Sequence, residues 1–211
     1  MRLFALSIFS ALVAAGSANL ILNGDFETNS AAGATFYNRS NADWTALMSN
    51  ATGYGSGAEL DLMTFGAFGS APQSGSYKAG MATGRGTDAF TFTLNGGVVA
   101  GQAYSFSFWA YRDQTFVSGN GSLNLGISSV NNAAGTTVFS TGGGVPSNTW
   151  TQFTGLFIAP ASGGFLSVEA VPGSSTVWYH VDNFSLEVVP EPATLAVLGL
   201  GAAALVRRRK A

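Results

Sequence analysis

The feature that most constrains the fold of this chain is an alternation of apolar and polar residues with a period of two. Residues 89–94 read AFTFTL, in which phenylalanine and leucine alternate with threonine. Residues 104–113 read YSFSFWAYRD and place Phe106, Phe108 and Ala110 on one face of an extended chain. Because successive side chains of a β-strand point to opposite faces, both segments are predicted to be half-buried strands.

Eight further segments have the composition of strands, and glycine-rich breaks separate them. They are residues 19–27, 58–65, 76–83, 121–130, 136–141, 149–159, 164–171 and 176–188. Eight to ten short strands without a convincing amphipathic helix favour an all-β fold, an antiparallel jelly-roll β-sandwich. Residues 28–57, around Trp44, carry no assignable element.

The two ends of the chain predict export and membrane anchoring. Residues 1–18 combine a positive start, an apolar stretch and small residues at the end, as a cleaved signal peptide does. Residues 193–206 are uncharged and would span only ~21 Å as a helix, which makes a thin anchor for a hydrocarbon core of ~30 Å. Basic residues that stay on the cytoplasmic side follow directly: Arg207, Arg208, Arg209 and Lys210.

We therefore expect a signal peptide (1–18), one sandwich domain (19–189) and a tail with a short hydrophobic helix (190–211). Pro190, Glu191 and Pro192 stand before the apolar run and the basic cluster. In this order and position the tail resembles the PEP-CTERM sorting signal of Gram-negative bacteria that make exopolysaccharide. The resemblance implies processing by signal peptidase and exosortase. It also implies anchoring in the inner membrane before processing, and a cell-surface or extracellular location afterwards.

Composition excludes several functions. Residues 19–189 contain four basic and ten acidic residues, a formal net charge of −6, which argues against nucleic acid and anionic membrane surfaces as partners. The chain has no cysteine, so disulfides, thiolate metal sites and a cysteine nucleophile are excluded. His180 is the one histidine, which rules out a histidine-rich zinc site. The sixteen phenylalanines argue for a folded domain rather than a disordered matrix protein.

The ends of the domain carry a second resemblance. NLILNGDFE at 19–27 and VDNFSLE at 181–187 are similar to the first and last strands of galactose-binding-like jelly rolls, which include carbohydrate-binding modules. The resemblance implies a structural calcium ion held by Glu27 and Asp182, with Asp25 nearby, as the one expected cofactor. The alternative is that these carboxylates only cap strand ends and turns.

The same alternation predicts a sugar-binding surface. Trp109 and Tyr111 point away from Phe106 and Phe108, so the outer face of the sheet would present two aromatic rings. Sugars stack on such rings, and Arg112, with Asp113 next to it, would bind hydroxyl groups. The alternative is that both rings are buried under the long loop or a second sheet.

Signals for an enzyme are weak. Glu59 and Asp61 alternate on one strand face and could form a glycosidase pair, but exposed acidic strand residues are far more common. No Gly-x-Ser-x-Gly motif is present, and His180 has no obvious nucleophile partner. We expect a non-catalytic surface or biofilm-matrix protein that binds exopolysaccharide. An interaction protein of the same fold without sugar affinity is the alternative, followed by a glycan-active hydrolase.

Overall fold

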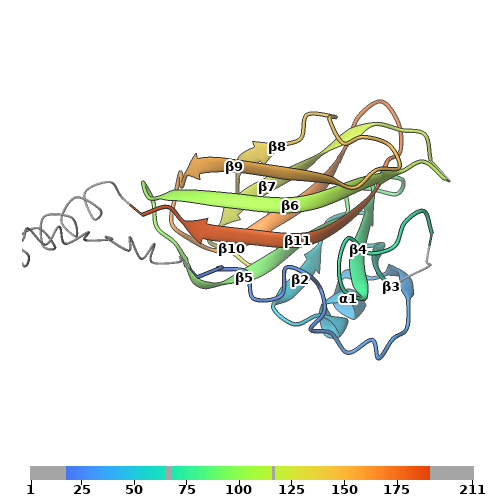
Figure 1. Ribbon diagram of the computed structural model, residues 1–211, viewed down its shortest axis with the longest axis horizontal. Coiled ribbons are helices and arrows are strands. Elements are labelled where there is room, and N and C mark those ends of the chain that lie inside the picture. The colour runs from blue at the N-terminus through green and yellow to red at the C-terminus, as the bar shows by residue number, and fades with distance from the viewer. Residues whose placement is uncertain (1–17, 65–67, 116, 191–211) are drawn as a thin grey trace, which may run out of the picture.

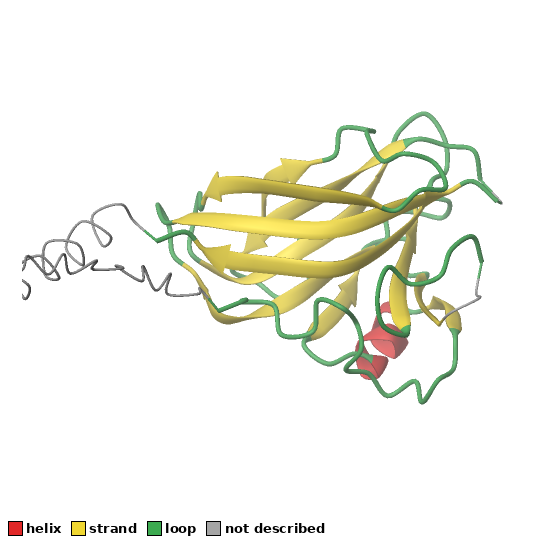
Figure 2. Ribbon diagram, viewed as in Figure 1, coloured by secondary structure: helices red, strands yellow, loops and turns green. Residues whose placement is uncertain are grey.

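The computed structural model describes residues 18–64, 68–115 and 117–190, which form two packed β-sheets (Figures 1 and 2). The elements in chain order are β1 (Phe36–Arg39), α1 (Asn41–Leu47), β2 (Ala51–Tyr54), β3 (Leu60–Thr64), β4 (Tyr77–Ala82), β5 (Ala89–Val98), β6 (Ala103–Asp113), β7 (Gly121–Ser128), β8 (Thr136–Ser140), β9 (Thr151–Ile158), β10 (Gly163–Pro172) and β11 (Trp178–Val188). The first sheet has the order β1-β3-β4-β11-β6-β9, and the second has the order β2-β5-β10-β7-β8. Neighbouring strands pair antiparallel in both sheets, so the predicted all-β antiparallel sandwich is confirmed.

Phenylalanines fill the space between the sheets. On β6, Phe106 and Phe108 point inward and are buried, as the alternation predicts. The ring of Phe108 stacks on that of Phe184 from β11, with centroids 5.2 Å apart and planes inclined by 5°. Phe184 also contacts Phe92 of β5, which joins the two sheets through one aromatic cluster. This packing explains why a chain with few charges and no disulfide can form a single core.

The prediction of a strand over residues 19–27 is wrong apart from one isolated bridge between Ile21 and Leu94. The segment turns instead, because Phe26 adopts a positive φ of 60° and the Asn23 side chain binds the backbone of Thr28. The Phe26 side chain is fully buried. The segment therefore seals one side of the core rather than extending a sheet.

The unassigned segment 28–57 contains β1, α1 and β2. Ser40 caps the seven-residue helix α1 by accepting a hydrogen bond from the Asp43 amide. Trp44 of α1 is fully buried, and its Nε1 donates to the Asp61 carbonyl at 3.1 Å. The helix thereby fixes β1 beside β3, which builds one wall of the pocket described below.

Both described ends of the chain lie at the same end of the sandwich (Figure 1). The Leu20 amide donates to the Leu186 carbonyl, and the Val189 amide donates to the Ala103 carbonyl. Pro190 is exposed, whereas residues 1–17 of the predicted signal peptide, Glu191, Pro192 and the basic cluster at 207–210 lie outside the described residues. Within the described part of the chain, no helix has the length and apolar character needed to cross a membrane.

Candidate functional site

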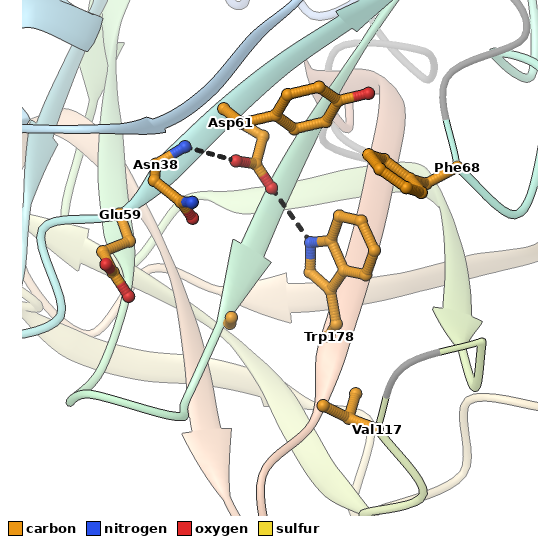
Figure 3. A pocket seen from close by; sticks show the side chains of 8 residues that line it. Asn38, Glu59, Asp61, Phe68, Val117 and Trp178 are labelled. Carbon is orange, nitrogen blue, oxygen red and sulfur yellow. Dashed lines mark hydrogen bonds between the residues drawn. The ribbon is translucent and has the colours of Figure 1, made fainter.

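A pocket of about 480 Å³ opens on the outer face of the six-stranded sheet, at the end where β11 begins (Figure 3). Its lining comes from the β1 and β3 strands, the end of β4, the start of β11 and three loops. The lining residues are Tyr37, Asn38, Glu59, Asp61, Phe68, Ala82, Val117 and Trp178. Aromatic rings and carboxylates therefore share one cavity.

Three aromatic rings stand in series around the pocket. The rings of Tyr37 and Phe68 meet edge to face, with centroids 5.0 Å apart. Phe68 then meets Trp178 at 5.9 Å. Phe68 is 43% exposed, so part of its ring is accessible from the solvent. Such rings offer apolar faces to a ligand that enters between them.

Asp61 is the polar centre of the pocket. Its Oδ1 accepts a hydrogen bond from the backbone N–H of Asn38 at 2.8 Å, and its Oδ2 accepts one from Trp178 Nε1 at 3.0 Å (Figure 3). Burial of the carboxyl raises its pKa from 3.8 to about 6, although both hydrogen bonds act in the opposite direction. The side chain is therefore a fixed acceptor that can change its charge near neutral pH.

Small residues on β4 allow Asp61 and Trp178 to meet. In the sheet, Asp61 pairs with Gly80 and Trp178 pairs with Ala82, so β4 separates the two strands that carry them. A Cβ atom on Gly80 would lie 2.6 Å from Asp61 Oδ2. Only glycine at this position leaves room for the carboxyl group above the sheet.

Glu59 lies beside Asp61 in the lining, and its carboxylate forms a salt bridge of 2.6 Å with Arg85. The Arg85 side chain is 79% exposed, whereas that of Glu59 is 22% exposed. The structure thus brings the two acids considered as a glycosidase pair to the same pocket. Both carboxylates already have partners, Glu59 in the salt bridge and Asp61 in its two hydrogen bonds.

A buried polar cluster supports the Phe68 side of the pocket. Lys78 and His180 are fully buried, and Lys78 Nζ lies 3.1 Å from His180 Nδ1. His180 Nε2 faces Asp113 Oδ2 at 3.5 Å. Burial lowers the pKa of Lys78 to about 8 and holds the pKa of His180 well below 6.5. Because Lys78 Nζ also donates to the Phe68 carbonyl at 3.2 Å, the cluster fixes the backbone that carries the Phe68 ring.

The structure gives the residues of the predicted sugar-binding surface different environments. Tyr111 is only 5% exposed, because its ring stacks on His180 and its hydroxyl donates to the Gly69 carbonyl. This residue matches the alternative of burial beneath a loop. Trp109 is half-buried on the same face, and the half-buried Arg112 donates to the Gly119 carbonyl and to Ser147 Oγ. None of the three lines the pocket.

The carboxylates predicted to hold calcium accept hydrogen bonds from backbone amides. Glu27 Oε1 accepts hydrogen bonds from the amides of Ser76 and Tyr77, at 2.7 and 2.8 Å. Asp182 Oδ2 accepts them from residues 73 and 74, and its Oδ1 accepts one from residue 183. Asp25 Oδ1 accepts from the Glu27 amide. In the described residues no group of three or more acidic or histidine side chains is arranged to hold a metal ion. Because calcium also takes backbone carbonyl and water oxygens, the calcium site stays a prediction.

The sequence reasoning missed most of the pocket. Trp178 lies in the strand-like segment 176–188, whose pattern does not indicate a pocket, and Tyr37, Asn38 and Phe68 come from the unassigned segment and a loop. The pairing of β1 with β3 and of β4 with β11 brings them together. Only Glu59 and Asp61 could be found from the sequence, through their spacing of two.

Comparisons with known proteins agree with the tail and the fold. A PEP-CTERM protein-sorting motif matches residues 188–210, which confirms the predicted signal and implies an exported, exosortase-sorted protein of the cell surface. A comparison with curated proteins gave no match.

The sandwich is similar in fold to solved structures of a glycosidase, a carbohydrate-binding module and an adhesin domain. An arabinose-bound α-L-arabinofuranosidase shares 20% identity over 82% of this chain, with a TM-score of 0.51, and this chain spans 26% of that enzyme. A family 61 carbohydrate-binding module in complex with β-1,4-galactotriose shares 14% identity over 82% of this chain and 100% of its own, with a TM-score of 0.49. The adhesin domain of Lys-gingipain from Porphyromonas gingivalis shares 14% identity, covers 81% of this chain and 99% of its own, and has a TM-score of 0.47. At these identities the likeness concerns the fold.

Proposed function

We propose that the chain is an exported carbohydrate-binding protein, sorted through its tail, whose binding site is the pocket around Asp61 and Trp178. The observation that carries the proposal is the combination of three aromatic rings with a fixed buried carboxyl group in one cavity. This combination suits a sugar, because the C–H faces of a sugar stack on rings while its hydroxyl groups donate to oxygen acceptors.

The charges of the pocket favour a neutral sugar. Glu59 and Asp61 are acidic, and no basic residue is among the described residues that line the cavity. Arg85 stands outside the lining and is bound to Glu59. A uronic acid would bring a third carboxylate close to two others, which is unfavourable in a partly buried site. A neutral segment of exopolysaccharide is therefore the proposed ligand, and a biofilm matrix is the proposed setting.

The arrangement of the two carboxylates favours a protein that binds a sugar without cleaving it. A glycosidase uses two carboxyl groups, one of which acts as an acid and the other as a nucleophile or base. Asp61 accepts two hydrogen bonds and Glu59 is paired with Arg85, so both are held as fixed hydrogen-bonding groups, which favours binding of a sugar over its cleavage. The alternative function is an interaction protein without sugar affinity. Such a protein would have the same fold but would not bind its partner through this pocket.

Calorimetric titration tests the proposal. Neutral oligosaccharides built from glucose, galactose, xylose or arabinose, together with oligouronates of the same length, would be added to the processed domain. We expect saturable binding of at least one neutral series and none of the oligouronates. Absence of binding throughout a broad glycan array would favour the interaction protein, and release of reducing ends from a bound sugar would favour the hydrolase.

A further inference from the structure

The four strands at the edges of the two sheets differ in how they are protected. β1 has four residues, an irregular register and a charged residue, Arg39. β2 has four residues, and β8 has five with a register shift against β7. Short, irregular or charged edges of this kind resist pairing with other chains.

The edge strand β9 has none of these protections. It has eight residues, TQFTGLFI, without a charge or a proline, and its register with β6 is regular from Ala103 to Ala110. Its backbone hydrogen bonds run to β6 on one side, and every second residue of an edge strand directs its N–H and C=O groups to the other side. An edge of this length is a template for a further strand.

The side chains along this edge are also uncharged and exposed. Leu156 and Ile158 are 73% and 69% exposed on the outer face, and Gln152 and Thr154 are exposed on the same face. A strand that must stay single carries charges at such positions. Exposed leucine and isoleucine two residues apart favour contact with another protein surface instead.

We propose that β9 pairs antiparallel with β9 of a second copy of the chain, which joins two six-stranded sheets edge to edge. We choose a second copy as the partner because two β9 strands match each other. They have the same length, no charge that would repel the other strand and no proline that would interrupt the hydrogen-bond ladder. A two-fold axis relates two such strands without further adaptation. The charged residues on the neighbouring β6 are Arg112 and Asp113, which lie beyond Ala110, the last partner of β9.

The pairing also separates the two tails of a dimer. Ile158 pairs with Ala103, whose carbonyl accepts the Val189 amide, so the tail leaves at the Ile158 end of β9. Antiparallel strands point in opposite directions, so the two tails of a dimer leave at opposite ends of the paired strands.

Sedimentation of residues 18–190 tests the pairing without sugar, so its failure is separate from a failure of the proposed binding site. This piece contains all strands of both sheets and the aromatic core, which supports its folding alone. We expect a dimer that Leu156→Lys weakens at least ten-fold. Val99→Lys is the matched control, because Val99 is also an exposed apolar residue, at 62%, but lies outside β9.

Melting curves verify that both variants are folded. A monomer for the unaltered piece at all soluble concentrations would overturn the proposal, as would equal effects of the two variants. A dimer that Leu156→Lys leaves intact would show that another surface is used. If the β9 amides are protected from hydrogen exchange in the full chain in detergent, while the shorter piece stays monomeric, the tail rather than a second copy pairs with this edge.

Single cysteines locate the register of the pairing, since the chain has no cysteine of its own. Thr154→Cys, Leu156→Cys and Ile158→Cys would be oxidised in separate samples of residues 18–190. Only residues next to a two-fold axis approach closely enough for a disulfide, so we expect one position to cross-link far faster than the others. Equal rates at all three positions and at a Val99→Cys control would indicate random collisions and contradict the pairing.

Discussion

Trp178 Nε1 donates a hydrogen bond of 3.0 Å to Asp61 Oδ2, across 117 positions of the sequence. The bond joins the start of β11 to β3 above the small residues of β4, and it holds the indole ring at the edge of the pocket (Figure 3). On its other side the indole meets the ring of His180 edge to face, at 4.7 Å. The ring is therefore oriented before any ligand arrives, which reduces the entropy cost of binding.

The first prediction concerns Asp182 and pH. Burial, with a smaller contribution from the nearby Glu27, raises the pKa of this carboxyl from 3.8 to about 7, although the hydrogen bonds from three backbone amides act in the opposite direction. The folded state then binds a proton that the unfolded state has lost, so this group's contribution to stability is lost as pH rises through about 4 to 7. Asp182→Asn removes the titration. We expect the unfolding free energy of the unaltered protein, relative to Asp182→Asn, to be larger at about pH 5 than at about pH 8.

Urea denaturation at the two pH values measures this difference, and the comparison cancels titrations that both proteins share, such as that of His180. Parallel pH profiles would show that the pKa of Asp182 is not raised in the folded state.

The second prediction concerns Tyr111, whose ring is buried between loops and His180. Tyr111→Ala should destabilise the domain by about 3 kcal/mol or more, as large core truncations do, without a specific loss of sugar affinity in the folded fraction. Tyr111→Phe keeps the ring and loses only the bond to the Gly69 carbonyl, so about 1 kcal/mol is expected. Thermal or urea unfolding gives both values. A stable Tyr111→Ala protein with weakened sugar binding would support the sugar-binding surface predicted from the sequence.

The third prediction concerns calcium. Glu27 Oε1 and both carboxylate oxygens of Asp182 accept hydrogen bonds from backbone amides, so these three oxygens already have partners. We expect the same melting temperature with excess calcium and with a chelator. An ion that binds only the folded state would raise the melting temperature by mass action. A calcium-dependent rise that Glu27→Gln abolishes would therefore support the site predicted from the sequence.

The fourth prediction concerns sorting. Replacing Pro190, Glu191 and Pro192 together with alanine should leave the tail attached and retain the protein in the membrane fraction, because the apolar run and its basic residues are unchanged. Immunoblots of membrane and medium fractions measure the outcome. Pro172→Ala, an exposed proline outside the motif, is the control. Secretion of the triple variant at the processed size would show that the motif does not direct cleavage.

Local patterns in the sequence were sufficient for the sandwich and for the sorting signal. The alternation on β5 and β6 reports the faces of single strands, and a face pattern determines which side is buried. It failed at residues 19–27, where the positive φ of Phe26 and the side-chain bonds of Asn23 outweigh the strand-like composition. One of the Asn23 bonds runs to the Ser49 carbonyl, a partner that is distant in sequence.

Most of the pocket could not be predicted from the sequence, because its residues meet only through contacts between distant segments. The spacing of Glu59 and Asp61 is visible in the sequence, but the contact between Asp61 and Trp178 depends on β4 pairing with both strands. The choice between exposure and burial for Tyr111 depended on loops that the alternation does not describe.

The pocket itself is tested most directly by titrating the bound neutral oligosaccharide into two tryptophan variants of the processed domain. Trp178 lines the pocket, whereas Trp109 is also half-buried on the outer face of the same sheet but lies outside the lining. Stacking of a nucleic-acid base on an aromatic ring is worth about 1–3 kcal/mol, and we take the same range for a sugar. Trp178→Ala should therefore weaken binding about five-fold or more, and Trp109→Ala should leave the dissociation constant unchanged. Both variants must first show a cooperative melting transition. Undiminished affinity of Trp178→Ala together with lost affinity of Trp109→Ala would contradict the pocket as the binding site.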